Sequence, residues 1–327
     1  MSANDIILDI QDLYKDYQLP RKNIFGKPSY VHAVQGITIQ LERGLIYGLV
    51  GESGCGKTTL AKMIAGVEMP TRGGIRFDAE HLIKCDTTGR QRENSRRVQL
   101  ILQDAYAALP PKRTVEQILN EPLEIHGLGN AAERRKKIEA TLETVQLPLS
   151  VLSRYHHELS AGVTQKINIT RALLLDVELI LADESISSLD PISRIEIMNL
   201  FLKLNAQHNL TIVFIAHDIS TVQFLCDKVI VMYLGVCVEY ADNPEIFVNS
   251  MHPYTQALMN AVPTLEKGLT GEPLYVLEGE VPSPTEMLPG CNFYSRCTHP
   301  ARDEQCRTRK PALAEKRSGH LVNCFKV

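Results

Sequence analysis

A glycine-rich segment at residues 51–59 carries the clearest chemistry in this sequence. Its order of residues matches G-x-x-x-x-G-K-[ST], the pattern of a phosphate-binding loop. The glycines let backbone N–H groups turn toward phosphate oxygens, the lysine can reach the outer phosphates of a nucleoside triphosphate, and the threonine after it can ligate magnesium. The predicted nucleotide-binding residues are Gly51, Glu52, Ser53, Gly54, Cys55, Gly56, Lys57, Thr58 and Thr59.

The segments that flank this loop are those that phosphate binding needs. Residues 45–50 form an apolar run that predicts a buried strand, and residues 60–65 follow a helical pattern that Gly66 closes. The helix would point the positive end of its dipole at bound phosphates. A glycine-rich turn that matches by chance is the alternative, and the strand before it and the helix after it argue against that alternative.

Three further polar residues follow two other predicted strands, at residues 179–182 and 211–216. Asp183 can hold magnesium beside the phosphate loop, Glu184 can act as general base toward a water molecule, and His217 can contact the γ-phosphate and orient that water. Taken alone, His217 fits an ordinary histidine and the two acids fit a helix cap. Their joint occurrence after a phosphate loop favours catalysis.

Strands and helices alternate along most of the chain. Strand-like runs occupy residues 6–41 and 228–233, and helical patterns occupy residues 114–147 and 192–204. This alternation predicts an α/β fold with a mostly parallel sheet and ligands at the carboxyl ends of its strands. After residue 262 prolines, cysteines and short polar segments dominate, so we expect a nucleotide-binding domain at 1–262 and a small extension at 263–327.

Composition narrows the function classes. The net charge is −3 and the pI is near 6.4, so nucleic acid is not an expected partner. The basic run at residues 134–137 fits the solvated face of a helix. No secretion signal is expected at the N-terminus, and no run of roughly 18 apolar residues is present that would predict a membrane span.

Half of the eight cysteines fall in the last 37 residues. In a reducing compartment such a group favours metal over disulfides. The intervals of five, eight and seventeen residues differ from the paired spacing of common zinc sites, so the spacing leaves an iron–sulfur cluster, zinc and plain buried thiols open, with His299 as a substitute ligand. The four are Cys291, Cys297, Cys306 and Cys324.

These motifs together resemble the ATP-binding cassette ATPases that power ABC transporters. The resemblance implies that Gln103 ligands magnesium and senses the membrane partner, and that Tyr17 stacks on adenine, although an ordinary strand tyrosine fits Tyr17 nearly as well. Residues 159–163, LSAGV, take the place of the signature LSGGQ, in which Ser160 and Gly162 would contact the γ-phosphate on the opposite subunit. Asp190 lies in the segment that is similar to the family's D-loop.

A closer resemblance is to the ATPase subunits of oligopeptide, dipeptide and nickel importers. It is carried by residues 48–57, 231–235, 252–258 and 277–284, and residues 22–30 are similar to the second, F-type, ATPase subunit. The resemblance implies an N-terminal antiparallel β subdomain and a helical subdomain at about 104–172. It also implies a cysteine-containing extension that holds a 4Fe-4S cluster in some members. Residues 252–254 are expected to dock that extension rather than to catalyse.

The resemblance also implies partners and a place in the cell. We expect ATP and Mg²⁺ as cofactors, a second homologous ATPase subunit, two transmembrane permeases and, indirectly, an extracytoplasmic solute-binding protein. The chain would lie peripherally on the cytoplasmic face of a bacterial inner membrane and drive peptide uptake. Import of nickel or a metal chelate, a catalytically weak ATP-binding partner, and an ABC ATPase acting on DNA or ribosomes are the alternatives. The last usually carries two cassettes or a long coiled coil, and this chain has neither.

Several residues depart from the family pattern. Ala161 adds a methyl group that could exclude a backbone with positive φ, and Val163 removes a side-chain amide. Thr164, Thr170 and Ser185 also replace the usual residues. Because each ATP in such dimers lies between one subunit's phosphate loop and the other's signature, the altered signature would affect the partner's loop. We therefore expect a heterodimer with unequal sites, in which this chain's own loop hydrolyses ATP.

Overall fold

The computed structural model describes residues 6–20, 28–78, 80–81, 95–102, 104, 106, 108–216, 218–261 and 277–327. Two of the predicted site residues, Gln103 and His217, lie outside these ranges.

The main sheet has eight strands in the order β11-β12-β10-β9-β3-β8-β7-β6. The five strands from β9 to β6 are parallel, whereas β10, β12 and β11 pair antiparallel at the other edge. The mostly parallel α/β sheet predicted from the sequence is confirmed. The strand bounds are β3 (Ile46–Val50), β6 (Val98–Ile101), β7 (Leu179–Asp183), β8 (Thr211–Ile215), β9 (Lys228–Tyr233), β10 (Val236–Asp242), β11 (Ala314–Arg317) and β12 (His320–Val322).

A second, antiparallel sheet has the order β2-β1-β4-β5. Its strands are β1 (Ile6–Gln18), β2 (Tyr30–Glu42), β4 (Arg72–Phe77) and β5 (Glu80–His81). Helix α1 (Lys57–Ile64) packs in the apolar core that β1 and β2 share with the main sheet. Alternation along β3 explains how the phosphate loop is held, because Tyr47 and Leu49 face this core while Ile46 and Val50 face the core on the opposite side of the sheet.

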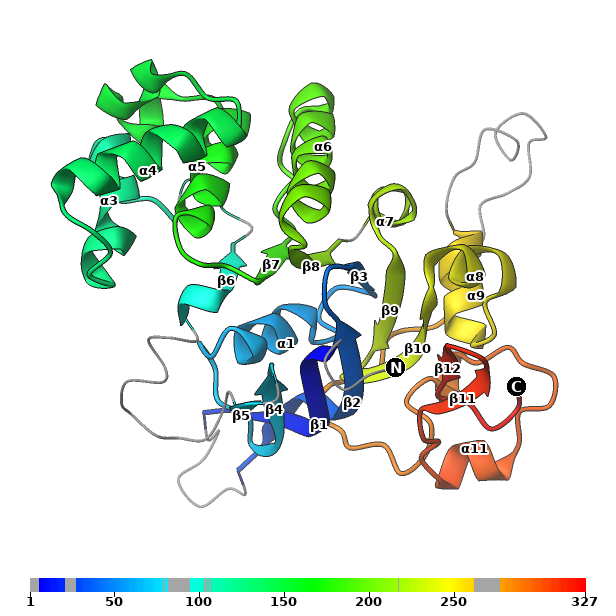
Figure 1. The fold of residues 1–327 in the computed structure, drawn as a ribbon. Helices are drawn as coiled ribbons and strands as arrows, with labels where there is room; N and C mark the ends of the chain where they lie inside the picture. Colours follow the sequence, from blue (N-terminus) through cyan, green and yellow to red (C-terminus); the bar gives the residue numbers. More distant parts are fainter. Residues whose placement is uncertain are drawn as a thin grey trace.

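The helical region lies apart from the antiparallel sheet (Figure 1). The predicted helical stretch at residues 114–147 divides in two at Gly127 and Gly129, which both have positive φ. Thr114 and Asn130 begin the two helices with capping boxes. The elements here are α3 (Val115–Ile125), α4 (Ala131–Thr144), η2 (Leu149–Ser153), η3 (His156–Glu158) and α5 (Ala161–Leu173).

Four more helices of the cassette lie in the described part of the chain. Helix α6 (Pro191–His208) begins at Asp190, whose carboxylate accepts hydrogen bonds from two backbone N–H groups, and it ends at Asn209 in the left-handed conformation. The other three are α7 (Ile219–Leu225), α8 (Asn243–Asn249) and α9 (Pro253–Asn260). Within the described part of the chain, no helix is both long enough and apolar enough to span a membrane.

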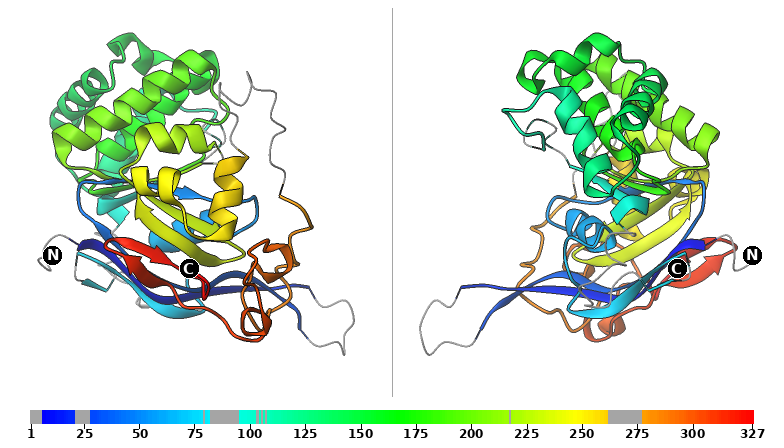
Figure 2. Two further views of the ribbon diagram at one scale, coloured as in Figure 1. Left: turned by 90° about the vertical axis from the view of Figure 1, so that its right-hand side faces the viewer. Right: turned by 60° about the vertical axis from the view of Figure 1, so that its left-hand side comes forward.

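The C-terminal extension joins the main sheet. Its strand β12 pairs with β10 at Glu239↔Val322 and Tyr240↔Leu321. Its other elements are η4 (Tyr294–Arg296), α11 (Glu304–Thr308) and β11. In Figures 1 and 2 the orange and red segments therefore lie along the side of the cassette, and the segment after residue 277 runs toward the phosphate-loop end of β9.

Candidate functional site

The phosphate loop connects β3 to α1, as its sequence predicts. Gly54 and Gly56 adopt φ values of 78° and 105°, conformations that favour glycine. Gly56 is the N-cap of α1 and makes no side-chain cap, so the first N–H groups of the helix remain available at the positive end of its dipole. Lys57 is only 5% exposed, and its ammonium donates to the carbonyl oxygens of Gly51 at 2.8 Å and Glu52 at 3.1 Å.

Thr58 and Asp183 come together beside this loop. The Thr58 hydroxyl donates to an Asp183 carboxylate oxygen at 3.3 Å, although the two residues are 125 positions apart in the chain. Burial raises the pKa of Asp183, while the hydrogen bond from Thr58 acts in the opposite direction. A hydroxyl and a buried carboxylate are oxygen ligands of the kind that Mg²⁺ prefers, so this pair fits the predicted magnesium position.

Glu184 follows directly at the end of β7, in an unusual backbone conformation. Its φ is 47°, a left-handed value that costs a glutamate roughly 1–2 kcal/mol. The conformation is held on both sides, because the Glu184 N–H donates to Ile215 at 3.0 Å and the Glu184 carbonyl accepts from both the backbone and the hydroxyl of Ser187. Strain that the surrounding structure maintains is typical of functional sites, and here it occurs at the carboxylate residue directly after Asp183.

Strand β2 lies against the same loop. A Cβ atom added to Gly56 would lie 2.1 Å from the carbonyl oxygen of Ala33, so the loop and this strand are in direct contact. Tyr17 pairs with Val31, two residues from Ala33, and the Lys15 ammonium lies 4.8 Å from the centre of its ring. The structure thus puts the predicted adenine-stacking residue on the strand next to the one that contacts the loop.

The altered signature begins helix α5. The Ser160 hydroxyl accepts a hydrogen bond from the Val163 N–H at 3.4 Å, and Ala161 is the first residue of the helix, with an ordinary negative φ. The methyl group of Ala161 is therefore compatible with the backbone, contrary to our concern about a positive φ. Gly162 packs so closely on α6 that an added Cβ would lie 2.6 Å from the Ser193 hydroxyl.

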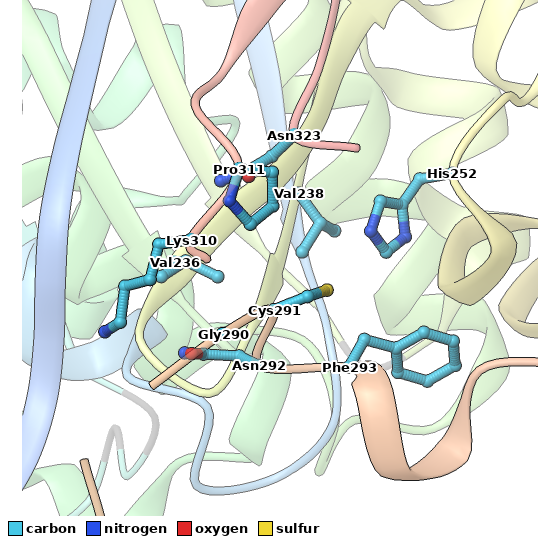
Figure 3. Close-up of a pocket in the computed structure, with 10 residues that line it drawn as sticks. All are labelled: Val236, Val238, His252, Gly290, Cys291, Asn292, Phe293, Lys310, Pro311 and Asn323. Atoms are coloured by element: carbon cyan, nitrogen blue, oxygen red, sulfur yellow. The ribbon is translucent and has the colours of Figure 1, made fainter. Parts of the chain in front are cut away.

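The four terminal cysteines line one pocket, although their spacing in the sequence is irregular. The pocket is also lined by His252 and His299, and an adjoining cavity shares His252 and Cys291 (Figure 3). Burial, together with the neighbouring thiols, raises the pKa of Cys291 to about 11. Among the described residues, no three His, Cys, Asp or Glu side chains already form a group able to hold a metal ion, and the four cysteines are free thiols.

One set of contacts at the phosphate loop could not be predicted from the sequence. The Glu52 carboxylate accepts two hydrogen bonds from the Arg296 guanidinium, at 2.7 and 3.0 Å, and the Glu52 N–H donates to the Tyr254 hydroxyl at 2.9 Å. Tyr254 belongs to the segment expected to dock the extension, and its ring does lie 5.4 Å from that of Phe293 in the extension, while its hydroxyl contacts the loop. Nothing in the sequence distinguishes Arg296 from the other arginines of the extension, so its pairing with Glu52 could not be predicted.

Comparisons with known proteins agree with this geometry. Residues 34–187 match the family model described as ABC transporter, and residues 238–306 match the one described as oligopeptide/dipeptide transporter, C-terminal region. The dipeptide transport ATP-binding protein DppF of Escherichia coli is 40% identical, over 98% of this chain and 94% of that protein. DppF of Haemophilus influenzae is 39% identical over 96% and 94%, and the oligopeptide transport ATP-binding protein AppF of Bacillus subtilis is 38% identical over 98% and 97%.

Solved structures show the same fold at lower identity. The ATP-binding cassette MJ0796, in a dimeric post-hydrolysis state bound to ADP and Pi, superposes with a TM-score of 0.64 at 24% identity, covering 72% of this chain and 99% of that one. CbiO1 from Clostridium perfringens superposes with a TM-score of 0.66 at 24% identity, covering 82% and 99%.

Proposed function

The chain belongs to the ATP-binding proteins of ABC transporters, and we propose that it is the ATP-hydrolysing subunit of a bacterial peptide importer. The observation that carries this proposal is the meeting of Thr58, Asp183 and Glu184 at the phosphate loop. The peptide substrate is supported by the relatives named for dipeptide and oligopeptide transport, which align with nearly the whole chain.

In this proposal the loop N–H groups and Lys57 would bind the phosphates of ATP, and Thr58 and Asp183 would hold Mg²⁺, which would neutralise charge on the phosphates. Glu184 accepts a proton from the water that attacks the γ-phosphate. Gln103 and His217 keep the roles that the resemblance implies, as magnesium ligand and γ-phosphate contact.

We further propose a heterodimer with unequal sites. As the resemblance implies, Ser160 and Gly162 would contact the γ-phosphate of the ATP held by a second, homologous ATPase. Asp190 caps the neighbouring helix α6. Val163 lacks the amide of the family signature, so the partner's loop is the weakened one. This chain's own loop, together with Asp183 and Glu184, is then the competent half.

The permeases of the importer would dock beside β6. A pocket of about 350 Å³ lies there, lined by residues of β6, α3 and α5. Leu102 and Ile125 line it and are 43% and 59% exposed, so apolar surface is available to a membrane partner. Gln103 follows Leu102 directly, which suits a residue that senses this partner. Co-purification of two permeases and a peptide-loaded binding protein would support the assignment, whereas a nickel chelate in that binding protein would overturn the peptide substrate.

The terminal cysteines are proposed to hold a metal, as a 4Fe-4S cluster or zinc. Four thiols that face one pocket are a suitable donor set for either. The absence of a ready-made group of ligands among the described residues means that the side chains must draw together when metal binds. Metal analysis and the visible absorption of protein purified without oxygen distinguish the cluster, zinc and bare thiols.

Replacing Glu184 by Gln tests the central proposal. The change keeps the size of the side chain and removes its capacity to accept a proton, so ATPase activity of the assembled complex should fall by about 10²–10⁴ while ATP still binds. Glu143→Gln, an exposed change on α4, is the matched control. Substantial activity in the Glu184→Gln complex would refute both the general base and the unequal sites.

A further inference from the structure

Glu52 is the point at which the C-terminal extension meets the phosphate loop. Each of its three polar groups has a partner. The carboxylate binds Arg296 of η4, the N–H binds the Tyr254 hydroxyl of α9, and the carbonyl accepts a hydrogen bond from Lys57. Glu52 thus connects Lys57, the proposed phosphate-binding lysine, to Arg296, which lies 244 positions after Glu52 in the sequence.

Arg296 is itself firmly held. Its side chain is 5% exposed, it donates to the Glu278 carbonyl and the Tyr233 hydroxyl, each at 3.4 Å, and its guanidinium lies 5.8 Å from the centre of the Tyr233 ring. Burial alone would lower the pKa of Arg296, but the hydrogen bonds and charge of Glu52 more than offset this and raise it. A partly buried ion pair of this kind adds little net stability, whereas its two-hydrogen-bond geometry fixes the position of both partners.

Residues 281–284 of the extension also lie along the outside of the loop. A pocket of about 180 Å³ is lined on one side by residues of the loop and on the other by Val281–Pro284. The His32 N–H donates to the Pro284 carbonyl at 2.9 Å, which ties this segment to β2. Arg296 projects from the turn between Cys291 and Cys297, so its position depends on the segment that carries two of the pocket cysteines.

We propose that Arg296 is a positioning residue for ATP binding: through Glu52 it sets the placement of Lys57 and of the phosphate loop. The inference rests on the proposed function, because it concerns the same ATP site. The extension is then part of the ATP-binding machinery, and a disturbance of its cysteine-bearing turn reaches the loop through this pair. Arg296 touches no nucleotide in this proposal and acts only through Glu52.

The test compares four forms of the full-length chain: wild type, Arg296→Met, Glu52→Gln and the double variant. Calorimetric titration with Mg-ATP should show binding weakened about tenfold in each single variant, because Lys57 and the loop are then less well placed for the phosphates; tenfold corresponds to about 1.4 kcal/mol of binding free energy. The double variant should be no weaker than either single variant, because both remove the same interaction. Arg296→Lys keeps the positive charge but cannot donate the two parallel hydrogen bonds of a guanidinium, so its affinity for Mg-ATP should lie between those of the wild type and Arg296→Met.

Arg307→Met is the matched control, since Arg307 lies in the same extension and pairs with Glu304 at 2.6 Å but is 60% exposed. It should leave ATP binding unchanged. A lower melting temperature in Arg296→Met with unchanged affinity for ATP would make the pair purely structural and overturn the inference. If Arg296→Met does not fold, the affinity of Glu52→Gln for Mg-ATP becomes the test, and an affinity equal to that of the wild type would overturn the inference. Failure of the wild type to bind ATP would instead refute the proposed function.

Discussion

Substitution of Gly56 by alanine isolates the contact between the phosphate loop and β2. Gly56 has a φ of 105°, and an added Cβ would lie 2.1 Å from the Ala33 carbonyl oxygen and 3.5 Å from the Met232 side chain. Gly54 and Gly66 also have positive φ, of 78° and 71°, but nothing lies within 4 Å of their added Cβ atoms. Alanine at any of the three positions therefore carries a backbone cost, and alanine at Gly56 carries a steric cost in addition.

The magnitudes follow from these two terms. Alanine in a left-handed conformation costs roughly 1–2 kcal/mol, so Gly54→Ala and Gly66→Ala should each lower the free energy of unfolding by about that amount. Ordinary Cβ contacts begin near 3.4 Å, so Gly56→Ala must push the loop or β2 apart by more than an ångström. Overpacking of that kind costs about 1–3 kcal/mol more.

Urea unfolding of the three variants, followed by circular dichroism, measures the difference. We expect Gly56→Ala to be less stable than Gly66→Ala by about 2 kcal/mol. Its affinity for Mg-ATP should also fall, because the N–H groups around the loop move with it, whereas Gly66→Ala should bind as the wild type does. Equal stability of Gly56→Ala and Gly66→Ala would show that the loop does not press on β2 as described.

Two further predictions concern the pocket in the extension. Burial lowers the pKa of His252 from 6.5 to about 3, so the unfolded chain binds a proton at a higher pH than the folded chain does. The contribution of neutral His252 to the free energy of unfolding is complete above pH 6.5 and is lost as the pH falls toward 3. The loss is about 2 kcal/mol at pH 5. Urea unfolding at pH 7 and pH 5 should show this loss in the wild type and a smaller one in His252→Asn, and equal losses would contradict it. Cys297→Ser should abolish bound metal and any visible absorption of the purified chain while Cys226→Ser, distant from the pocket, should not, and metal retained by Cys297→Ser would exclude this ligand.

Much of the cassette was predictable because its signals are local. The strands at residues 179–182, 211–216 and 228–233 are runs of apolar residues, and the structure confirms each within one residue at its ends. The helix predicted after the phosphate loop begins at Lys57, so the lysine belongs to its first turn. Asp183 could be placed near Thr58 because Asp183 ends β7, and Thr58 follows the loop that leaves the carboxyl end of β3 in the same parallel sheet.

The remainder depended on contacts between distant parts of the chain. No local pattern indicates that Arg296 pairs with Glu52, or that cysteines spaced irregularly over 34 residues line one pocket. The left-handed conformation of Glu184 was equally hidden, because glutamate has no intrinsic preference for positive φ and only the hydrogen bonds around it maintain that conformation. Helical periodicity at residues 114–147 extended across Gly127 and Gly129, whose φ values end one helix before the next begins.

The structure also changes how the altered signature should be judged. Gly162 is needed by the fold of this chain, since any side chain there would collide with Ser193, so its retention says nothing about contact with a nucleotide. Ala161 does not disturb the backbone, because it occupies an ordinary first turn of α5. What remains to decide the competence of the signature is Val163, which is half-buried and has replaced an amide with an apolar side chain. Restoring that amide with Val163→Gln should therefore raise hydrolysis at the partner's site, if the sites are unequal for the reason proposed.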